Sequence, residues 1–188
     1  MTLQATTWQT VGPYFRIGLE NFNAENITPP AAASDRVTIE CTLLDGNGRP
    51  VPDAVIEVWQ ADANGAFRRA PIESENAAQT EFSGFIRVPT DAEGRFRFST
   101  VHPGQVPGPD GTLQAPHLAV RIMMRGLLKD LVTRMYFPCD AVASDPVLQL
   151  VPDQRRRTLI AERSPDREAT YVWKIELQGD RETVFFDC

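Results

Sequence analysis

Apolar and polar residues alternate along several short segments of the chain. Between residues 37 and 43, every odd position is apolar and every even position is polar, from Val37 to Leu43. A two-residue period is that of a β-strand with one face buried and the other in solvent. This stretch therefore predicts a half-buried strand.

Similar alternation, or a short run rich in β-branched and aromatic residues, recurs along the chain. A turn signal, Asp91-Ala92-Glu93-Gly94, separates two of these segments, so we expect residues 85–88 and 95–98 to form a hairpin. Many short strands joined by turns are typical of an all-β sandwich. The predicted fold is mainly β, an antiparallel β-sandwich with strands over 37–43, 55–59, 85–88, 95–98, 117–124, 131–137, 171–177 and 183–186.

Two regions depart from this pattern. Residues 1–36 are rich in Pro, Ala, Asn and Thr and have little periodicity, which predicts an irregular N-terminal arm before a single domain over 37–188. Short helices are expected near residues 145–162, the first capped by Ser144 or Asp145 and the second opened by Pro152 and running to Ala161.

Composition narrows the classes of function. The net charge is −6, and the only lysines are Lys129 and Lys174 among 19 basic residues. An acidic chain without a basic stripe argues against nucleic acid as a partner, and the run Arg155–Arg157 is interpreted as a solvated helix face. No apolar run approaches the ~18–20 residues of a membrane span, which argues against a membrane protein.

The cysteines and the first residues bear on the compartment. Met1 to Thr10 has neither a basic region nor an apolar core, so we expect no secretory signal. Three cysteines without CxxC spacing predict free thiols in a cytoplasmic protein. Cys41 is in phase with the apolar positions of its strand, which predicts a small core residue.

Candidate chemistry is sparse when the residues are considered alone. The chain has two histidines, too few for a site built from several imidazoles. His102 precedes a Pro-Gly turn and His117 begins a strand, so each is interpreted as a structural residue. No Ser or Cys stands in a nucleophile elbow, and no Gly-rich phosphate loop is present. The residues alone predict a β-sandwich without an evident catalytic set.

Four segments in order carry a family resemblance. Residues 48–65, residues 94–98 with Pro103-Gly104, residues 115–118 and Tyr136-Phe137 resemble the intradiol ring-cleaving dioxygenases. The resemblance implies a β-sandwich and, in the enzymes that keep their metal, a non-haem Fe(III) held by two tyrosines and two histidines. Phenolate oxygens suit this hard trivalent cation, and two imidazoles complete its ligand set.

The same resemblance locates four ligand positions in this sequence. They hold Phe67, Val106, His117 and Ala119, and Gln114 stands where the family usually has an arginine that polarises the substrate. Only His117 retains a side chain that can bind a metal. The resemblance therefore implies that this chain binds no metal by itself and has no complete catalytic set.

One branch of the family pairs an iron-free chain with a homologous chain that holds the Fe(III), and this sequence resembles the iron-free chain. In that branch, the motif around Thr10, Gly12, Pro13 and Tyr14 reaches toward the partner's active site, and the arginine matched by Arg134 contributes to the same pocket. The implied function is to complete a partner's site that uses O2 to open a catechol carrying a ring carboxylate.

Alternatives remain open on the sequence. Arg134 could be an exposed strand cation, and the aromatic motif could be a clamp on its own domain. The chain could also be an inert transthyretin-like sandwich that serves as a carrier or assembly module, which would need neither feature. A self-sufficient catechol or hydroxyquinol dioxygenase is disfavoured because those enzymes keep all four ligands.

Overall fold

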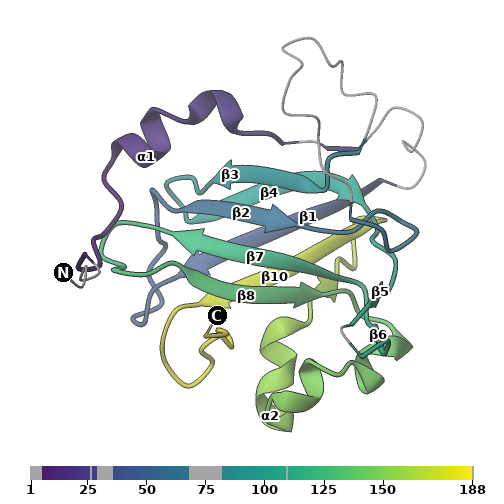
Figure 1. Cartoon of the computed structure of the whole chain (residues 1–188). Helices are drawn as coiled ribbons and strands as arrows, with labels where there is room; N and C mark the ends of the chain where they lie inside the picture. The colour runs from purple at the N-terminus through teal and green to yellow at the C-terminus, as the bar shows by residue number, and fades with distance from the viewer. Residues whose placement is uncertain (1–5, 26, 29–35, 68–81, 109, 188) are drawn as a thin grey trace, which may run out of the picture.

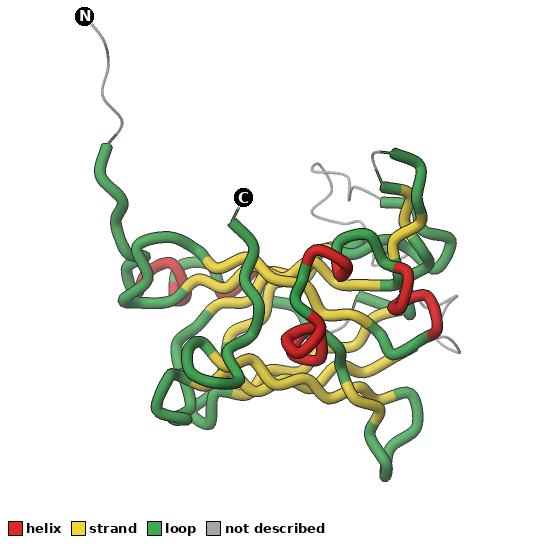
Figure 2. Tube along the Cα trace, turned by 90° about the horizontal axis from the view of Figure 1, so that it is seen from below, coloured by secondary structure: helices red, strands yellow, loops and turns green. Residues whose placement is uncertain are grey.

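The computed structural model describes residues 6–25, 27–28, 36–67, 82–108 and 110–187. Two four-stranded sheets lie face to face (Figures 1 and 2). The first has the order β4-β1-β10-β9 and the second β3-β2-β7-β8. The strands are β1 (Arg36–Leu44), β2 (Val55–Trp59), β3 (Phe85–Pro89), β4 (Arg95–Val101), β7 (His117–Met123), β8 (Leu131–Tyr136), β9 (Glu162–Arg163) and β10 (Thr170–Glu176), with a small hairpin of β5 (Val106–Pro107) and β6 (Leu113–Gln114).

The predicted mainly β sandwich is confirmed, with one pair that is not antiparallel. β1 runs parallel to β10, with Ile39 opposite Tyr171 and Leu43 opposite Ile175. Parallel neighbours need a long connection between them. Here the whole second sheet and the helical segment lie between β1 and β10 in the chain, so local alternation contained no information about this pairing.

The predicted hairpin of residues 85–88 and 95–98 is wrong. Both strands form, but β3 pairs with β2 and β4 pairs with β1, so the turn at Asp91–Gly94 takes the chain from one sheet to the other. Ile86 and Phe96 both point into the space between the sheets. Two consecutive strands show the same alternation whether they pair with each other in a hairpin or lie in two facing sheets. Only the hydrogen-bonded neighbour of each strand distinguishes the two arrangements.

The predicted strand over residues 183–186 is also wrong. This segment makes one isolated bridge, between Phe186 and Val132. The Thr133 hydroxyl donates to the Val184 carbonyl, and the Thr183 hydroxyl accepts from the Glu176 amide, at 2.7 and 3.0 Å. The segment is thus held to β8 and to the end of β10 by single side-chain and backbone hydrogen bonds, without a continuous strand ladder.

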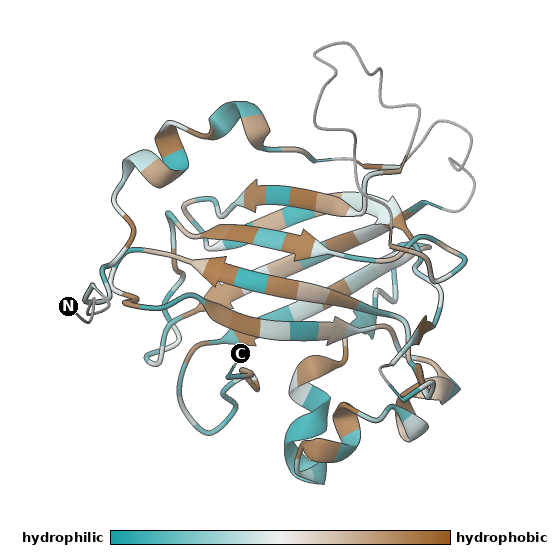
Figure 3. Cartoon of the chain, in the orientation of Figure 1, coloured by the Kyte–Doolittle hydropathy of each residue, from teal (hydrophilic) through white to brown (hydrophobic). Residues whose placement is uncertain are grey.

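The main core lies between the sheets and is formed by the inward positions of both. The alternation is visible along the strands in Figure 3. A smaller core lies between the outer face of β8 and the helical segment, and Tyr136 and Leu148 are fully buried in it. Cys41 is buried in the main core as predicted, and burial raises the pKa of its thiol.

The helical segment is a series of short turns, as expected. It contains η3 (Asp140–Ser144), η4 (Leu148–Leu150), α2 (Asp153–Arg156) and η5 (Arg157–Leu159). Asp145 caps η4 by accepting hydrogen bonds from the Val147 and Leu148 amides at 2.9 and 2.8 Å. The last turn ends at Leu159 instead of the predicted Ala161.

The N-terminal arm lies along the open edges of the sandwich. It contains α1 (Tyr14–Ile17) and η1 (Glu20–Phe22). The Ala24 amide donates to the Arg87 carbonyl of β3, and Ser99 of β4 bonds both Ile27 and Glu25 through its backbone. The arm therefore covers one edge of each sheet, β3 and β4, where exposed strands would otherwise invite pairing with other chains. Residues 1–5 and 29–35 of the predicted arm lie outside the described residues, and the division into an arm of 1–36 and a domain of 37–188 stays a proposal.

None of the helices among the described residues has both the length and the apolar composition needed to cross a membrane. In the predicted solvated run, Arg155 and Arg156 lie at the end of α2 and form ion pairs with Glu182 and Asp153.

Candidate functional site

A row of four side chains crosses the outer face of the second sheet. The strand register aligns Phe85, Trp59, Ala119 and Arg134 on β3, β2, β7 and β8. Trp59 is half exposed and its ring lies 4.4 Å from that of Phe85. This row presents aromatic surface at one end and a guanidinium group at the other.

Arg134 lies near three of the expected ligand positions, Val106, His117 and Ala119. It is the cross-strand partner of Ala119, and its Nη1 donates to Gln114 Oε1 at 2.6 Å. Gln114 pairs with Val106 in the β5–β6 hairpin, and His117 begins β7, two residues before Ala119. We call the expected ligand positions Phe67, Val106, His117 and Ala119, together with Gln114 and Arg134, the degenerate site.

Phe67 belongs to the loop after β2. Two glycines allow the backbone of this loop to lie in close contact with the loop before Val106. Gly65 has φ of 82°, and a Cβ there would collide with the carbonyl oxygen of Gln105. The Gly104 amide donates to the Asp62 carbonyl at 2.9 Å. The backbone thus holds the two expected tyrosine positions near each other, while the Phe67 side chain itself is 63% exposed.

His117 is buried and neutral. Its Nδ1 donates to the Ala115 carbonyl at 2.8 Å, which assigns the proton to that nitrogen. Burial lowers the pKa of His117, and the positive charge of Arg134 lowers it further. The ring also lies 5.5 Å from that of its cross-strand partner Tyr136. The sequence interpretation of a structural histidine fits these contacts.

A hydrogen-bonded chain extends from Arg134 into the small core. Arg134 Nη1 donates to the Tyr136 hydroxyl at 3.3 Å, and this hydroxyl donates to Asp145 Oδ1 at 3.1 Å. Asp145 is fully buried and also accepts from the Ala115 amide at 2.8 Å. Burial raises the pKa of Tyr136, so its phenol stays protonated. The direct partners of the Arg134 guanidinium, Gln114 and Tyr136, are thus neutral, and the Asp145 carboxylate is reached only through the Tyr136 hydroxyl.

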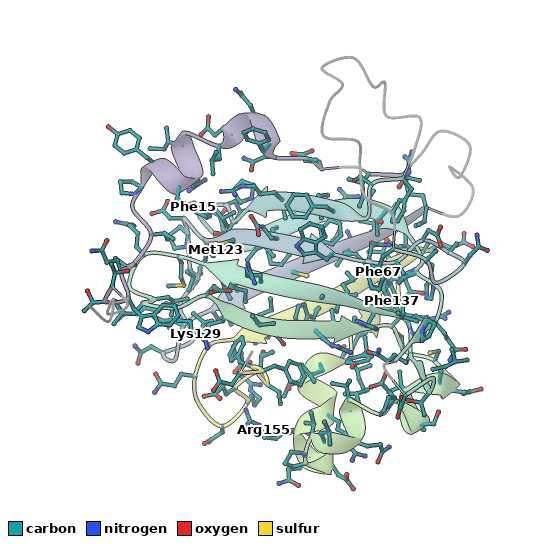
Figure 4. The ribbon with its side chains drawn as sticks, viewed as in Figure 1. Phe15, Phe67, Met123, Lys129, Phe137 and Arg155 are labelled. Atoms are coloured by element: carbon teal, nitrogen blue, oxygen red, sulfur yellow. The ribbon has the colours of Figure 1, made fainter. Side chains whose placement is uncertain are left out.

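The N-terminal motif lies elsewhere in this chain. The Gly126 amide donates to the Thr10 hydroxyl at 2.8 Å, just beyond the end of β7. His117 and Ala119 lie at or near the start of that strand, roughly 20 Å away at the rise per residue of a strand. Figure 4 shows Phe15 and Phe67 toward opposite ends of the strands of the second sheet, and Figure 1 shows α1 and β5 toward the same two ends. Gly12, Pro13 and Tyr14 adjoin α1 and are exposed, Tyr14 to 80%.

Comparison with known proteins identifies the family. A family model described as Dioxygenase (Dioxygenase_C) matches residues 12–179. The chain belongs to the intradiol dioxygenase family. It is 41% identical to the protocatechuate 3,4-dioxygenase alpha chain of Burkholderia cepacia, over 99% of this chain and 98% of that one. It is 36% identical to the beta chain from the same organism, over 77% of this chain and 65% of that one.

Solved structures support the fold alone. The dioxygenase domain of a carbohydrate-binding fusion protein from Streptomyces sp. SirexAA-E superposes with a TM-score of 0.61 and 20% identity. The match covers 86% of this chain and 89% of that one. The sandwich is therefore shared with solved structures of dioxygenases.

The degenerate site does not fit the iron that the family implies. Phe67, Val106 and Ala119 have no donor atoms, and His117 supplies a single imidazole nitrogen. Within the described ranges, no three His, Cys, Asp or Glu side chains gather in a group that could hold a metal ion. Phenolate donors are required for Fe(III) in this ligand set, and neither expected tyrosine position provides one.

Sequence reasoning missed several residues that shape this region. Asp145 was considered only as a helix cap, although it also holds Tyr136 and the start of β7. Arg87 was not singled out, yet it is buried on β3 against the arm. Its signal was present: an arginine within the apolar strand Phe85–Pro89 requires a partner for its charge.

Proposed function

We propose that this chain is the iron-free alpha subunit of a heteromeric protocatechuate 3,4-dioxygenase. A homologous beta-type chain would hold the Fe(III), and this chain would complete the pocket in which O2 cleaves protocatechuate to 3-carboxy-cis,cis-muconate. The observation that carries the proposal is an intact dioxygenase scaffold with three of four ligand positions lacking donor atoms. The cytoplasm is the proposed compartment, from the cysteine pattern.

Similarity to the two chains of the related enzyme supports the assignment to the alpha type. The match to the alpha chain spans nearly the full length, whereas the match to the beta chain covers 77% of this chain. Homology to both chains fits a hetero-oligomer built on one scaffold. The carrier alternative has no support of this kind.

The state of Arg134 suits recognition of a carboxylate. Among the described residues, its hydrogen bonds go to Gln114 and Tyr136 and both use Nη1, and no carboxylate forms an ion pair with it. Nη2 and Nε therefore retain donors for an anion. A guanidinium held by neutral groups keeps its net charge, and a charge-assisted hydrogen bond in a partly dry site contributes roughly 1.5–3 kcal/mol.

The N-terminal motif and Arg134 lie near opposite ends of β7. Each would therefore contact a substrate pocket from a different side of this subunit. The exposed motif Thr10, Gly12, Pro13 and Tyr14 is available to a neighbouring chain. The apolar side chains of Tyr14, in this motif, and of the nearby Ile17 are exposed, and such side chains are more stable against a protein surface than in water. We propose that this motif contributes pocket wall to the partner.

The test is steady-state ring cleavage by the reconstituted pair with Arg134→Ala. Loss of the guanidinium should reduce kcat/KM for protocatechuate by about tenfold to a hundredfold, mainly through KM, because the carboxylate is present in ground and transition states alike. Arg134→Lys should recover part, since an ammonium lacks the planar fork. Catechol without a carboxylate should be affected far less.

Arg121→Ala is the matched control, because Arg121 is an exposed arginine on the same face that pairs with Asp130. Iron content is measured in every variant. Unchanged kinetics of Arg134→Ala at full iron occupancy would refute the pocket role of Arg134.

A further inference from the structure

Arg87 is a buried cation whose side chain contacts the arm. It lies on the outer face of β3, opposite Glu57 of β2, and its side chain is 6% exposed. Nη1 donates to Glu57 Oε1 at 3.2 Å, and Nη2 donates to the backbone carbonyl of Phe15 at 2.7 Å. The guanidinium carbon also lies 4.5 Å from the centre of the Phe15 ring. One planar group therefore connects the sheet to α1.

The same residue also holds the other end of the helical part of the arm. The backbone carbonyl of Arg87 accepts a hydrogen bond from the Ala24 amide at 2.9 Å. The segment between these two contacts contains α1 and η1, and neither has a buried residue. An exposed four-residue helix is not stable by itself in water, so its position depends on its attachments. Arg87 supplies one attachment at each end, and the ion pair of Arg16 with Asp53, at 2.6 Å, is a further contact of α1 with the domain.

Burying Arg87 has a cost that points to a positional role. Its Nε is buried without a hydrogen-bond partner. An unsatisfied donor on a buried charge is unfavourable, and an apolar residue would fill this strand position without it. What only arginine provides here is a fork that bonds Glu57 and the Phe15 carbonyl at once, under an aromatic ring.

We propose that Arg87 is a positioning residue that fixes the Gly12–Tyr14 motif in the place where the partner's pocket receives it. Phe15 faces inward onto Arg87 while its neighbour Tyr14 is 80% exposed, so the clamp orients the outward side of the motif. The Phe15 amide bonds the Gly12 carbonyl at 3.0 Å, which transmits the constraint to the turn. This inference rests on the proposed function of the arm.

The clamp is tested by hydrogen exchange on the full chain with Arg87→Gln. The amides of Phe15, Arg16, Ile17 and Ala24 are hydrogen-bonded in the arm and report its order. Loss of a charged hydrogen bond and a ring contact should raise their exchange rates by about tenfold or more. Arg87→Lys should give intermediate rates. Arg121→Gln, an exposed arginine next to Glu57 that does not contact the arm, should leave them unchanged.

The positional role is tested by kinetics of the reconstituted pair. If only part of the population has an ordered arm, apparent affinity falls by that fraction, so KM for protocatechuate should rise roughly threefold to tenfold with kcat nearly constant. Arg87→Lys should partly restore KM. A merely structural defect would instead lower kcat together with iron content, and this result would overturn the proposal.

Phe15→Ala is the second variant, because it leaves the Arg87–Glu57 pair in place if Arg87→Gln fails to fold. It should change exchange and KM in the same directions. Unchanged arm exchange in both variants would overturn the clamp. Faster exchange with unchanged KM would overturn the positioning role and remove the arm from the pocket, whereas failure of Arg134→Ala alone would count against the other part of the proposed function.

Discussion

At the scale of the residue, both histidines of this dioxygenase relative have a lowered pKa and a backbone carbonyl as hydrogen-bond partner. His117 bonds the Ala115 carbonyl, and His102 bonds the Pro103 carbonyl at 2.9 Å and packs 4.4 Å from the Phe137 ring. Burial is the largest cause that lowers the pKa of each. His102 was predicted as a hydrogen-bonded loop residue, which these contacts confirm.

These lowered pKa values predict how stability depends on pH. The unfolded chain protonates both histidines below about 6.5, whereas the folded chain resists protonation. The contribution of the two residues is therefore complete above pH 6.5 and is lost as pH falls toward their folded pKa values. We expect the urea midpoint of the wild-type chain to decrease when the pH is lowered from 7.5 to 5.5. The decrease should be smaller in the double variant His102→Gln/His117→Gln. Parallel losses in the two proteins would contradict this assignment.

At the scale of the element, Asp145 joins three pieces of structure. Its carboxylate caps η4, accepts from the amide before β7 and holds the hydroxyl of Tyr136 on β8. All these groups lie in a buried region, where unpaired donors are costly. The position of η4 between β7 and β8 therefore depends on this side chain.

Replacing this carboxylate should weaken the whole segment. Asp145→Ala leaves three amides and a phenol without their acceptor, and we expect a loss of about 2–4 kcal/mol in the free energy of unfolding. Asp153→Ala, an exposed acid at the start of α2, is the control and should change stability little. Denaturant unfolding measures both. A loss below about 1 kcal/mol for Asp145→Ala would show that water replaces the carboxylate there.

At the scale of the whole molecule, the degenerate site predicts the metal content of the chain. Expressed alone and exposed to ferric iron, the full chain should bind far less than one iron per chain and show no red-brown phenolate-to-iron absorption. Three ligand positions without donors leave one imidazole, which does not hold Fe(III) against hydrolysis. Metal analysis and the visible spectrum measure this.

The iron-bearing partner, treated in the same way, is the positive control. Co-purification with a homologous chain that has Tyr, Tyr, His and His at the four positions is the expected companion result. Stoichiometric iron with the absorption band in the lone chain would refute the ligand assignment.

The sequence by itself determined most of the long strands and the family. Period-two alternation placed β1 and β8, because burial of one strand face constrains each position locally, and short runs rich in β-branched and aromatic residues placed β2, β7 and β10. The segments around Phe67, Val106, His117 and Ala119 identified the family, and they predict the missing donors because donor chemistry belongs to single residues.

Only the tertiary structure decided which elements meet. The turn after β3 leads to another sheet, β10 lies parallel to β1, and the last predicted strand reduces to one bridge. Pairing depends on which unpaired edges and apolar faces come together in space, and alternation along one strand does not record its neighbour. For the same reason, the attachment of Phe15 to Arg87, 72 residues apart, became visible only in the folded chain.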